Sequence, residues 1–549
     1  MGRPGEDWGG IVGLALACEQ VDPFGEVEVR FGAIVEVLRS MEAARMTESD
    51  LERRLDEEGR ELLRQLLEAH LRMRSPGEAE GPVADAAGVE RTETRAHQRQ
   101  LVTSFGKIDL TRTGYAEPGR ESLHPLDGDL NLARESYSLE LRRKVAWEAA
   151  RGSFEEAQEA VKRQTGVRIP KRQVEELTAR AAADFQGFHL AREEEVEAPA
   201  PQQTESAPEL PLLILSFDGK GIVVRKQDLR ESTKRRRARG DKGAKKPGRK
   251  RMAIVATVYD VAPYVRTPLQ VADGLFPTDD STAHFRLQRK RRDELKQNRR
   301  PRPAAKRVWA SLERDPSQVM VEAFAEAAAR DPERRRQWIV LVDGEQHQLR
   351  LLRRYRKKYD FRIVLDFYHV LERLWAAAHE LHPEDAWQRT GYVRGRVLKI
   401  LSGWASQAAS GMRAAATRRE LADDDRKAVD DACDYLLKYQ EYLPYGECLE
   451  AGLPIGTGVV EGTCRSLIIH RMDRSGARWS LAGAEAVLKL RALVQSGDFD
   501  DYWKFHEAAE QRRNHADLYA DGQIPETRKT GFTRDKPDLK IVKSPRRTG

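Results

Sequence analysis

The 549-residue sequence has few cysteines and no long apolar run. No stretch of 18 or more consecutive apolar residues occurs, so no transmembrane helix is predicted. The segment Met1–Asp7 lacks the basic-then-apolar order of a signal peptide, and we therefore expect a cytoplasmic protein. No Cys-x-x-Cys or Cys/His zinc spacing is present, which predicts reduced, mostly buried thiols. The four cysteines are Cys18, Cys433, Cys448 and Cys464.

The positive charge of the chain is modest overall but locally concentrated. The formal net charge is +7 and the pI is about 9.0. Residues 234–251 read KRRRARGDKGAKKPGRKR, and residues 286–307 are again rich in Lys and Arg. Clustered cations displace counterions from a nucleic-acid backbone, so Arg235 and Arg236 are predicted phosphate contacts. Solvated surface loops are the alternative interpretation.

The length exceeds what one ordinary core accommodates and predicts about two to four domains. Shifts in composition divide the chain into seven segments. These are a helical region ending in a Gly/Pro-rich linker (1–98), a β-hairpin with helices (99–192), an acidic Pro-rich linker (193–210), the first part of an α/β domain (211–380), an all-helical insertion (381–450), the last part of that domain (451–508) and a basic tail (509–549).

The first half of the chain shows mainly helical patterns. Leucines recur at helical spacing within 25–75, whereas 99–117 alternates apolar and polar residues around a Phe-Gly turn, as in a β-hairpin. A helix ending near Gly166 is followed by a second that starts at Lys171 and runs to about Phe185, which is the pattern of a helix-turn-helix. Lys171 and Arg172 open that second helix, the end that enters a DNA groove. A helical hairpin without a DNA role is the alternative.

Strand and helix patterns alternate from residue 212 onward. Strands are predicted at 212–217, 220–225, 252–259, 337–342 and 361–365, and helices at 317–330, at 345–358 and from Phe367. This alternation predicts a layered α/β sheet with parallel strands. No strand is expected in 381–450.

Three acidic residues follow apolar segments of this domain. Asp218 closes the first strand, Asp343 closes the strand at 337–342, and Glu461 follows a Gly-rich lead into a helix. Open α/β sheets bind ligands at strand ends. Three carboxylates suit two Mg²⁺ or Mn²⁺ ions, about 4 Å apart, that act on phosphodiesters. The alternatives are Asp-Gly turns and a helix N-terminal acid at Glu461.

A further acidic element makes the pattern specific. Asp366-Phe-Tyr-His369 follows a strand, 23 positions after Asp343. The order of these motifs, the helical insertion and Glu461 resembles DDE transposases of the Mutator-like branch, which have an RNase H-like fold. Four stretches within roughly residues 100–508 are similar to bacterial ISKra-type insertion-sequence transposases. They read SLHPLDGDLNLARESYS, VLDFYHVLERLWAAA, PIGTGVVEGTCRSLIIHRMDRSGARWS and GAEAVLKLRALVQSGDFDDYWKFH.

The resemblance implies a DNA transposase. It implies an RNase H-like α/β catalytic domain with a helical insertion, preceded by a mainly helical DNA-binding region with a β-hairpin. The partners would be double-stranded DNA, as element ends and target, and further copies of the chain in a dimer or larger multimer, near the nucleoid. Two Mg²⁺ or Mn²⁺ ions would serve cleavage and strand transfer. A silent DNA-binding relative, or a nuclease without strand transfer, are the alternatives.

The resemblance also implies roles for the acids. Asp218, Asp343 and Glu461 would be the metal-binding catalytic acids, with Asp366 and His369 supporting the site. The second acid is either Asp343 or Asp366. Asp343 is preferred, because in related transposases that acid precedes the Asp/Cys-x-x-His signature. His369 could instead pack a helix.

Basic residues follow Glu461 within a few helical turns. We expect them to contact phosphate, or alternatively to lie on a solvated helix face. They are Arg465, Arg471, Arg474 and Arg478. Trp479 is predicted to stack on an unpaired base, with core packing as the alternative.

Overall fold

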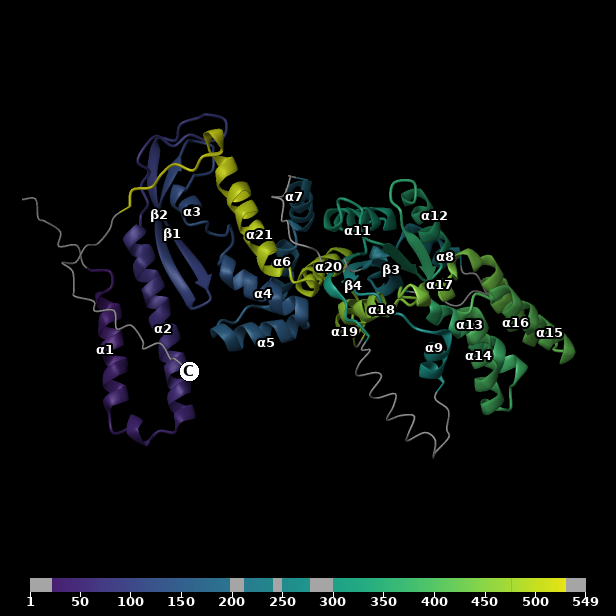
Figure 1. The fold of residues 1–549 in the computed structure, drawn as a ribbon. Coiled ribbons are helices and arrows are strands. Elements are labelled where there is room, and N and C mark those ends of the chain that lie inside the picture. The colour runs from purple at the N-terminus through teal and green to yellow at the C-terminus, as the bar shows by residue number, and fades with distance from the viewer. Residues whose placement is uncertain (1–21, 198–211, 240–248, 277–299, 475, 530–549) are drawn as a thin grey trace, which may run out of the picture. The chain divides into compact units, whose positions relative to one another are not determined.

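A computed structural model describes residues 22–197, 212–239, 249–276, 300–474 and 476–529 (Figure 1). The chain forms two compact units. Unit 1 comprises residues 1–141, 161–168 and 507–549, and unit 2 comprises 142–160 and 169–506. No helix in the described ranges has both the length and the apolar character needed to cross a bilayer.

Unit 1 begins with two long helices and a β-hairpin. Helices α1 (Gly25–Arg39) and α2 (Glu48–Arg74) confirm the helical pattern of 25–75. Strands β1 (Glu93–Thr103) and β2 (Gly106–Ala116) pair antiparallel, which confirms the hairpin. The short helix α3 (Pro125–Asp129) follows. A small core joins them through Leu71, Leu101, Ile108, Leu110, Leu126 and Leu132.

The linker predicted at the end of the first segment is wrong, because residues 76–98 are folded and β1 begins among them. Val83 is buried. The Asp85 carboxylate accepts hydrogen bonds from two backbone N–H groups of its own loop and from Arg91 and Arg120. A Gly/Pro-rich composition therefore marks a tight turn here, held by a buried acid.

The predicted basic tail at 509–549 is also wrong in its first part. Helix α21 (Phe499–Asn514) enters it, and two 3₁₀ turns follow. Tyr519 is buried beside Val83 and Tyr115, and the Arg528 N–H donates to the Glu78 carbonyl at 2.7 Å. The C-terminal segment thus completes unit 1, while 530–549 lie outside the described residues.

Unit 2 contains a five-stranded mixed sheet of order β5-β4-β3-β6-β7. The strands are β3 (Leu212–Val223), β4 (Lys250–Val261), β5 (Ala304–Ser311), β6 (Trp338–Val342) and β7 (Arg362–Leu365). Strand β3 pairs antiparallel with β4 and parallel with β6; β4 and β5 are antiparallel, and β6 and β7 are parallel.

Three expectations for this sheet need correction. The sheet is mixed rather than parallel. The predicted strands 212–217 and 220–225 form one strand, because β4 pairs with β3 along its full length, across Asp218 and Gly219. Strand β5 was not predicted, because its first half is polar and belongs to the basic segment 286–307. Its second half alternates buried side chains between the two faces of the sheet.

The helices of unit 2 follow the sequence patterns closely. Helices α11 (Pro316–Arg330), α12 (Gln346–Tyr355) and α13 (Phe367–Leu381) confirm the predictions for the α/β region. Part of the basic segment 234–251 is helix α8 (Glu231–Arg239), and α9 (Pro268–Leu275) was not predicted.

Helices also precede the sheet. They are α4 (Leu139–Arg151), α5 (Phe154–Thr165), α6 (Lys171–Ala181) and α7 (Phe185–Glu197). Helix α6 starts where predicted but ends at Ala181 rather than near Phe185. Helix α7 extends into the predicted linker 193–210, so that linker starts too early, and 198–211 lie outside the described residues.

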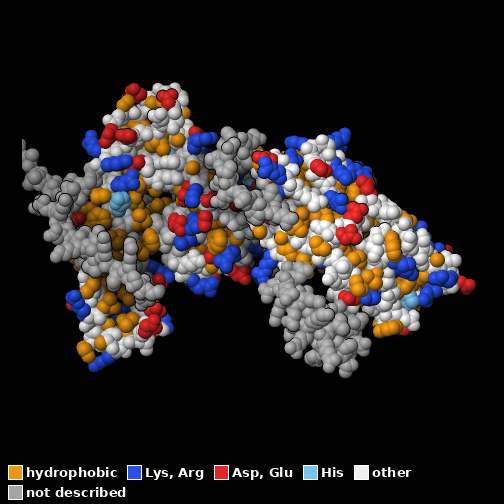
Figure 2. Space-filling view, in the orientation of Figure 1, with side chains coloured by type: hydrophobic (Ala, Val, Ile, Leu, Met, Phe, Trp, Pro, Cys, Tyr) orange, Lys and Arg blue, Asp and Glu red, His pale blue; other side chains and the backbone are white. Residues whose placement is uncertain are grey.

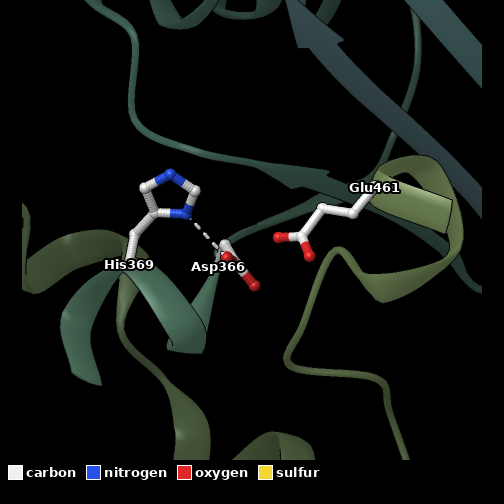
Figure 3. Close-up of side chains that lie close together, drawn as sticks. All are labelled: Asp366, His369 and Glu461. Carbon is white, nitrogen blue, oxygen red and sulfur yellow. Dashed lines mark hydrogen bonds and ion pairs between the residues drawn. The ribbon is translucent and has the colours of Figure 1, made fainter. Parts of the chain in front are cut away.

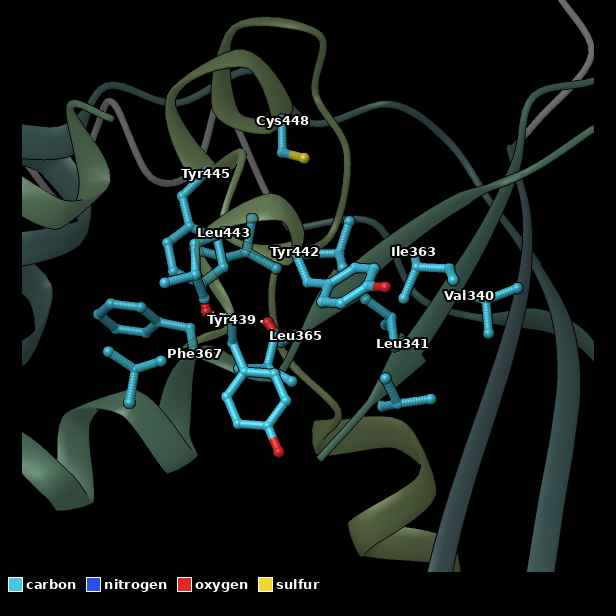
Figure 4. Packing of buried hydrophobic residues seen from close by; sticks show 14 of the residues in the cluster. Val340, Leu341, Ile363, Leu365, Phe367, Tyr439, Tyr442, Leu443, Tyr445 and Cys448 are labelled. Atoms are coloured by element: carbon cyan, nitrogen blue, oxygen red, sulfur yellow. Dashed lines mark hydrogen bonds between the residues drawn. The ribbon is translucent and has the colours of Figure 1, made fainter. Parts of the chain in front are cut away.

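The segment 381–450 is helical and contains no strand, as predicted. It comprises α14 (Ala386–Leu401), α15 (Ala405–Arg418), α16 (Asp423–Lys438), a 3₁₀ turn and α17 (Tyr445–Glu450). Its aromatic side chains Tyr439, Tyr442 and Tyr445 pack against β6, β7 and Phe367 (Figure 4). The helical segment therefore shares one core with the sheet.

The chain returns to the sheet through one helical run and a final helix. Helix α18 (Gly458–Cys464), a π-helical turn (Arg465–Ile469) and α19 (His470–Met472) are continuous, and α20 (Leu481–Ser496) follows. Buried side chains of α18 and α20 join those of α4 and α6 in a second core cluster, which includes Val255 and Val308 of the sheet.

Candidate active site

Asp343 and Asp366 lie side by side at the ends of two neighbouring parallel strands. Strands β6 and β7 pair up to Val342 and Leu365, so each aspartate is the first residue beyond its strand. The Asp366 N–H donates to the Val342 carbonyl at 2.8 Å, and Asp366 precedes the first residue of α13. The sequence prediction that both acids sit at C-terminal strand ends is confirmed.

The Asp366 carboxylate is fully buried and has a partner at each oxygen. Oδ1 accepts the Thr457 backbone N–H at 2.8 Å, and Oδ2 lies 2.7 Å from Nδ1 of His369 in the first turn of α13 (Figure 3). Burial without such partners would be costly for a carboxylate. Asp366 is thus fixed in one position by an amide and an imidazole.

Glu461 reaches the same place from α18. The Thr457 hydroxyl donates to Glu461 Oε1 at 3.0 Å, while its N–H holds Asp366. The backbone before α18 passes close to the start of α13: a Cβ atom at Gly456 would lie 3.2 Å from the Tyr368 ring and 3.5 Å from Asp366 Oδ1. The Gly-rich lead into Glu461 therefore has a steric reason. Thr457 was not predicted as a site residue, because the neighbouring sequence gives no sign of its hydrogen bonds to Asp366 and Glu461.

One group of potential ligand atoms forms at this point. Asp366, His369 and Glu461 each offer one atom, and these atoms lie within 4.8 Å of one another. Of the predicted metal-binding set, only Glu461 belongs to the group. Asp218 and Asp343 do not join it in the described part of the chain.

Asp218 lies within β3 rather than at its end, which corrects the prediction. It is opposite Val255 of β4, two residues beyond Ser216, the last β3 residue paired with β6. Its Oδ1 accepts the Gly219 N–H at 2.6 Å. Burial and the adjacent Asp218 carboxylate raise the pKa of the Cys464 thiol. Because Cys464 ends α18, Asp218 borders the helix that carries Glu461.

Asp343 is half-buried at the start of a tight turn. Its Oδ1 accepts the Glu345 N–H at 3.0 Å, and Gly344 adopts φ +93°, where a Cβ would lie 2.8 Å from Leu365. Two tyrosines of the helical segment 381–450 hold this turn, one within α16 and one at its C-cap. Tyr435 donates to the Asp343 carbonyl at 3.2 Å, and Tyr439 donates to that of Gly344 at 2.9 Å. The sequence gives no local sign of these contacts.

The hydrogen bond to Asp366 sets the charge of His369. It raises the pKa of His369 to about 9, against the opposing effect of burial. Without a bound cation the imidazole is therefore protonated near neutral pH, and it would have to release that proton to coordinate one. The remaining donors are carboxylate oxygens, which suit Mg²⁺ or Mn²⁺. Glu461, together with Asp343 or Asp366 at the neighbouring strand ends, offers oxygen donors that fit such an ion, and His369 is a hydrogen-bond partner of Asp366.

The helix after Glu461 is irregular at the next turn. Residues Arg465–Ile469 are π-helical. Such turns are rare in proteins and frequent at functional sites. Arg465 is exposed, whereas Leu467 and Ile468 are buried. The π turn thus changes which side chains face solvent directly after the site.

The predicted DNA contacts of α6 are on the surface. Lys171 is exposed and pairs with Glu155 at 2.6 Å, and Arg172 is exposed and pairs with Glu176 at 3.0 Å. Exposed ion pairs of this kind contribute little to stability, so both cations can exchange partners at small cost.

The predicted contacts after Glu461 divide into two groups. Arg465, Arg474 and Arg478 are exposed. Arg471 is buried, with its guanidinium 5.0 Å from the Phe154 ring and 4.8 Å from the Trp479 ring.

Trp479 itself is buried, and its indole N–H donates to the Met472 carbonyl at 3.0 Å. The surface roles predicted for Arg471 and Trp479 are therefore wrong, because both pack in the interior of unit 2. Core packing, the alternative for Trp479, is what the structure contains.

The basic segments are only partly described. Arg235 is exposed on α8, whereas the side chain of Arg236 lies outside the described residues. So do 240–248 and 277–299. On the described part of one face, Lys and Arg side chains are interspersed with acidic ones (Figure 2).

Comparison with known proteins identifies no family. No protein-family model matches the sequence, and no curated protein matches it significantly.

Proposed function

We propose that this protein is a DNA transposase that binds the terminal inverted repeats of its insertion sequence and catalyses metal-dependent DNA cleavage and strand transfer. One observation carries the proposal. The acids expected to act together, Asp218, Asp343, Asp366 and Glu461, belong to β3, to the ends of β6 and β7, and to the helix that borders β3. They come from segments up to 243 positions apart in the chain.

An RNase H-like catalytic core is part of the proposal. The resemblance implies an α/β core, and the described part of unit 2 contains a mixed sheet covered by helices. The order β5-β4-β3-β6-β7, with β3 central, is compatible with such a core. The helical segment 381–450 lies between β7 and the Glu461 helix, as the family pattern requires.

Divalent cations, when bound, would activate the attacking oxygen and stabilise the leaving oxygen of a phosphodiester. Asp218 and Glu461 would hold them together with a second aspartate. Asp343 remains our choice for that role, because both oxygens of Asp366 already have protein partners, whereas Asp343 accepts a single N–H from the residues that the structure describes. Asp366 is then a positioning residue that links His369 to Thr457.

The exposed cations complete the proposal. Lys171 and Arg172 at the start of α6, and Arg465 and Arg478 near the site, would bind DNA phosphates. Phosphate contacts position a duplex and carry no sequence information by themselves. Recognition of the repeats would therefore need additional base contacts.

Cleavage assays with matched variants test the proposal. Duplexes carrying the DNA that flanks the gene would be incubated with purified protein and Mg²⁺ or Mn²⁺. Wild type would be compared with Asp218→Asn, Asp343→Asn, Asp366→Asn and Glu461→Gln. We expect cleavage to be lost in Asp218→Asn and Glu461→Gln, and the Asp343/Asp366 pair identifies the second acid by the larger loss.

The control variant is Asp425→Asn, an exposed acid in the first turn of α16, which should cleave as wild type does. Retained cleavage in both Asp218→Asn and Glu461→Gln would refute the catalytic proposal. Binding without cleavage in Mn²⁺ would favour a silent DNA-binding relative. Cut but never joined products would favour a nuclease without strand transfer.

A further inference from the structure

A cavity of about 390 Å³ lies beside the candidate site in unit 2. Its walls come from the end of β4, from α9, from the segment before β5, from the start of α13 and from the Gly-rich lead into α18. The side chains that matter to the argument are Tyr264, Arg266, Arg300, Arg302 and Tyr368. Its volume is within the usual range for small-molecule sites.

The lining is cationic. Three arginines contribute to it, and no Asp or Glu is among the described residues that line it. Arg266 is half-buried and donates to the carbonyls of Tyr264 and Leu453, at 3.3 and 3.0 Å. Burial lowers the pKa of Arg266, and the neighbouring Arg300 lowers it further. Gathered like charges of this kind favour an anionic occupant.

The lining also presents aromatic surface. The Tyr264 ring lies beneath the Arg266 guanidinium, with 5.2 Å between the guanidinium carbon and the ring centroid. Tyr368 is 45% exposed although it sits between buried Phe367 and the site residue His369. Its ring packs over the backbone of Gly456, next to Asp366. The Tyr368 ring therefore lies between the cavity and the candidate site at Asp366.

We propose that the cavity holds one unpaired nucleotide of a DNA strand, with its base against the tyrosine rings and its phosphate facing the arginines. The inference rests on the proposed function, in which a DNA strand is the substrate. Every base offers a π face to an aromatic ring. Guanidinium groups bind phosphate in a planar, bidentate manner. The nucleotide would sit directly beside the bond to be cleaved.

The combination of groups selects this occupant over simpler ones. A free phosphate would use the arginines and leave the tyrosine faces in water. An uncharged aromatic molecule would leave the arginines without a counter-ion. A paired base inside a duplex offers only its edges to a side pocket. An unpaired nucleotide uses both kinds of surface.

Binding of labelled oligonucleotides separates these occupants. The probes are a fluorescent single-stranded oligothymidylate and an abasic strand with the same number of phosphates. We expect wild type to bind the oligothymidylate more tightly. Tyr264→Leu or Tyr368→Leu should reduce that preference about tenfold, since stacking contributes roughly 1–3 kcal/mol per base. Tyr368→Phe keeps the ring and should keep the preference.

Charge variants test the phosphate contact. Arg300→Glu and Arg302→Glu, both at exposed positions, should weaken the binding of both probes about equally. Arg354→Glu and Trp387→Leu are matched controls at exposed positions of unit 2 that do not line the cavity, and they should change neither. Equal binding of the two probes by wild type, or a preference that survives both tyrosine-to-leucine changes, would overturn the inference.

The two proposals fail in different ways. If the protein cuts flanking DNA in an Asp218-dependent manner but the tyrosine variants bind and cut as wild type does, the cavity inference alone is wrong. If the base preference depends on Tyr264 and Tyr368 but no cleavage occurs with Mg²⁺ or Mn²⁺, the cavity stands and the transposase proposal is wrong.

Discussion

Two buried acids of unit 1 and the candidate site acids of unit 2 differ in the groups that surround them. In unit 1, Asp127 pairs with both Arg99 and Arg112, and Asp85 pairs with Arg91 and Arg120. In the described part of unit 2, Asp218, Asp343 and Glu461 have no ion pair with Arg or Lys. Their hydrogen-bond donors are uncharged groups: backbone amides, the Thr457 hydroxyl and the Cys464 thiol beside Asp218.

The difference indicates two uses of negative charge. An acid neutralised by arginines holds surrounding chain segments together, and the hydrogen bonds that Asp85 accepts, first from its own loop, lower its pKa to about 2. An acid held only by neutral donors keeps its charge available for a cation that binds later. Asp366 lies between these cases, because its partner is the ionisable His369.

The largest expected effect separates stability from cleavage. Asp127→Asn should lower the free energy of unfolding by about 3 kcal/mol, because it removes the buried carboxylate that two half-buried guanidinium groups share as their counter-charge. Glu461→Gln should change it by less than about 0.5 kcal/mol, because Glu461 is exposed, yet reduce cleavage by about a thousandfold. Urea unfolding and cleavage assays on both variants measure the contrast. Equal loss of stability in the two would refute it.

The Asp366–His369 pair gives the next effect. Below the ordinary pKa of 6.5 the protonated imidazole fully stabilises the fold through Asp366, and this contribution is lost as pH rises through about 9. NMR of ¹³C-labelled histidine should show one ring titrating near 9. In Asp366→Asn the pKa reported by that resonance should fall toward the ordinary value of 6.5. His369→Gln assigns the signal by removing it, and a wild-type ring that titrates near 6.5 would contradict the prediction.

Unit 1 should respond to acid through His124. Burial and then Arg112 lower its pKa to about 3, so folding favours the neutral ring. Stability from this group is complete above 6.5 and falls as pH drops toward 3, at about 1.4 kcal/mol per pH unit. Between pH 7.5 and 5 we expect a loss of about 1–2 kcal/mol in thermal unfolding.

The matched variants for this test are His124→Gln and His70→Gln. His124→Gln should remove most of the acid sensitivity, whereas His70→Gln, at an exposed position of α2, should leave it unchanged. The same sensitivity in all three proteins would assign it to other groups.

The smallest expected effect concerns the link between Asp366 and Glu461. Thr457→Val keeps the N–H that Asp366 accepts and removes only the hydroxyl that Glu461 accepts. One hydrogen bond contributes about 1 kcal/mol, so cleavage should fall about fivefold with unfolding unchanged. Thr457→Ser restores the hydroxyl and should recover the rate. A Val variant as active as wild type would show that Glu461 does not depend on this contact.

Much of the local structure could be predicted because it depends on local periodicity. The leucine spacing of 25–75, the Phe-Gly hairpin and the helix from Phe367 each reflect contacts close in sequence. Strand β5 was not predicted from the sequence, because its polar first half becomes a strand only by pairing with β4. The segments 76–98 and 510–529 have loop-like compositions and fold because each packs against the other.

The site shows the same division. The sequence by itself determined which acidic residues follow apolar strands. It also determined that a Gly-rich segment leads into Glu461. Only the tertiary structure decided that Thr457 joins Asp366 to Glu461, that Asp218 lies inside a strand, and that Arg471 and Trp479 are buried. Burial and long-range hydrogen bonds depend on which distant segments come into contact. The residue pattern within one segment does not specify the other segments that it will contact.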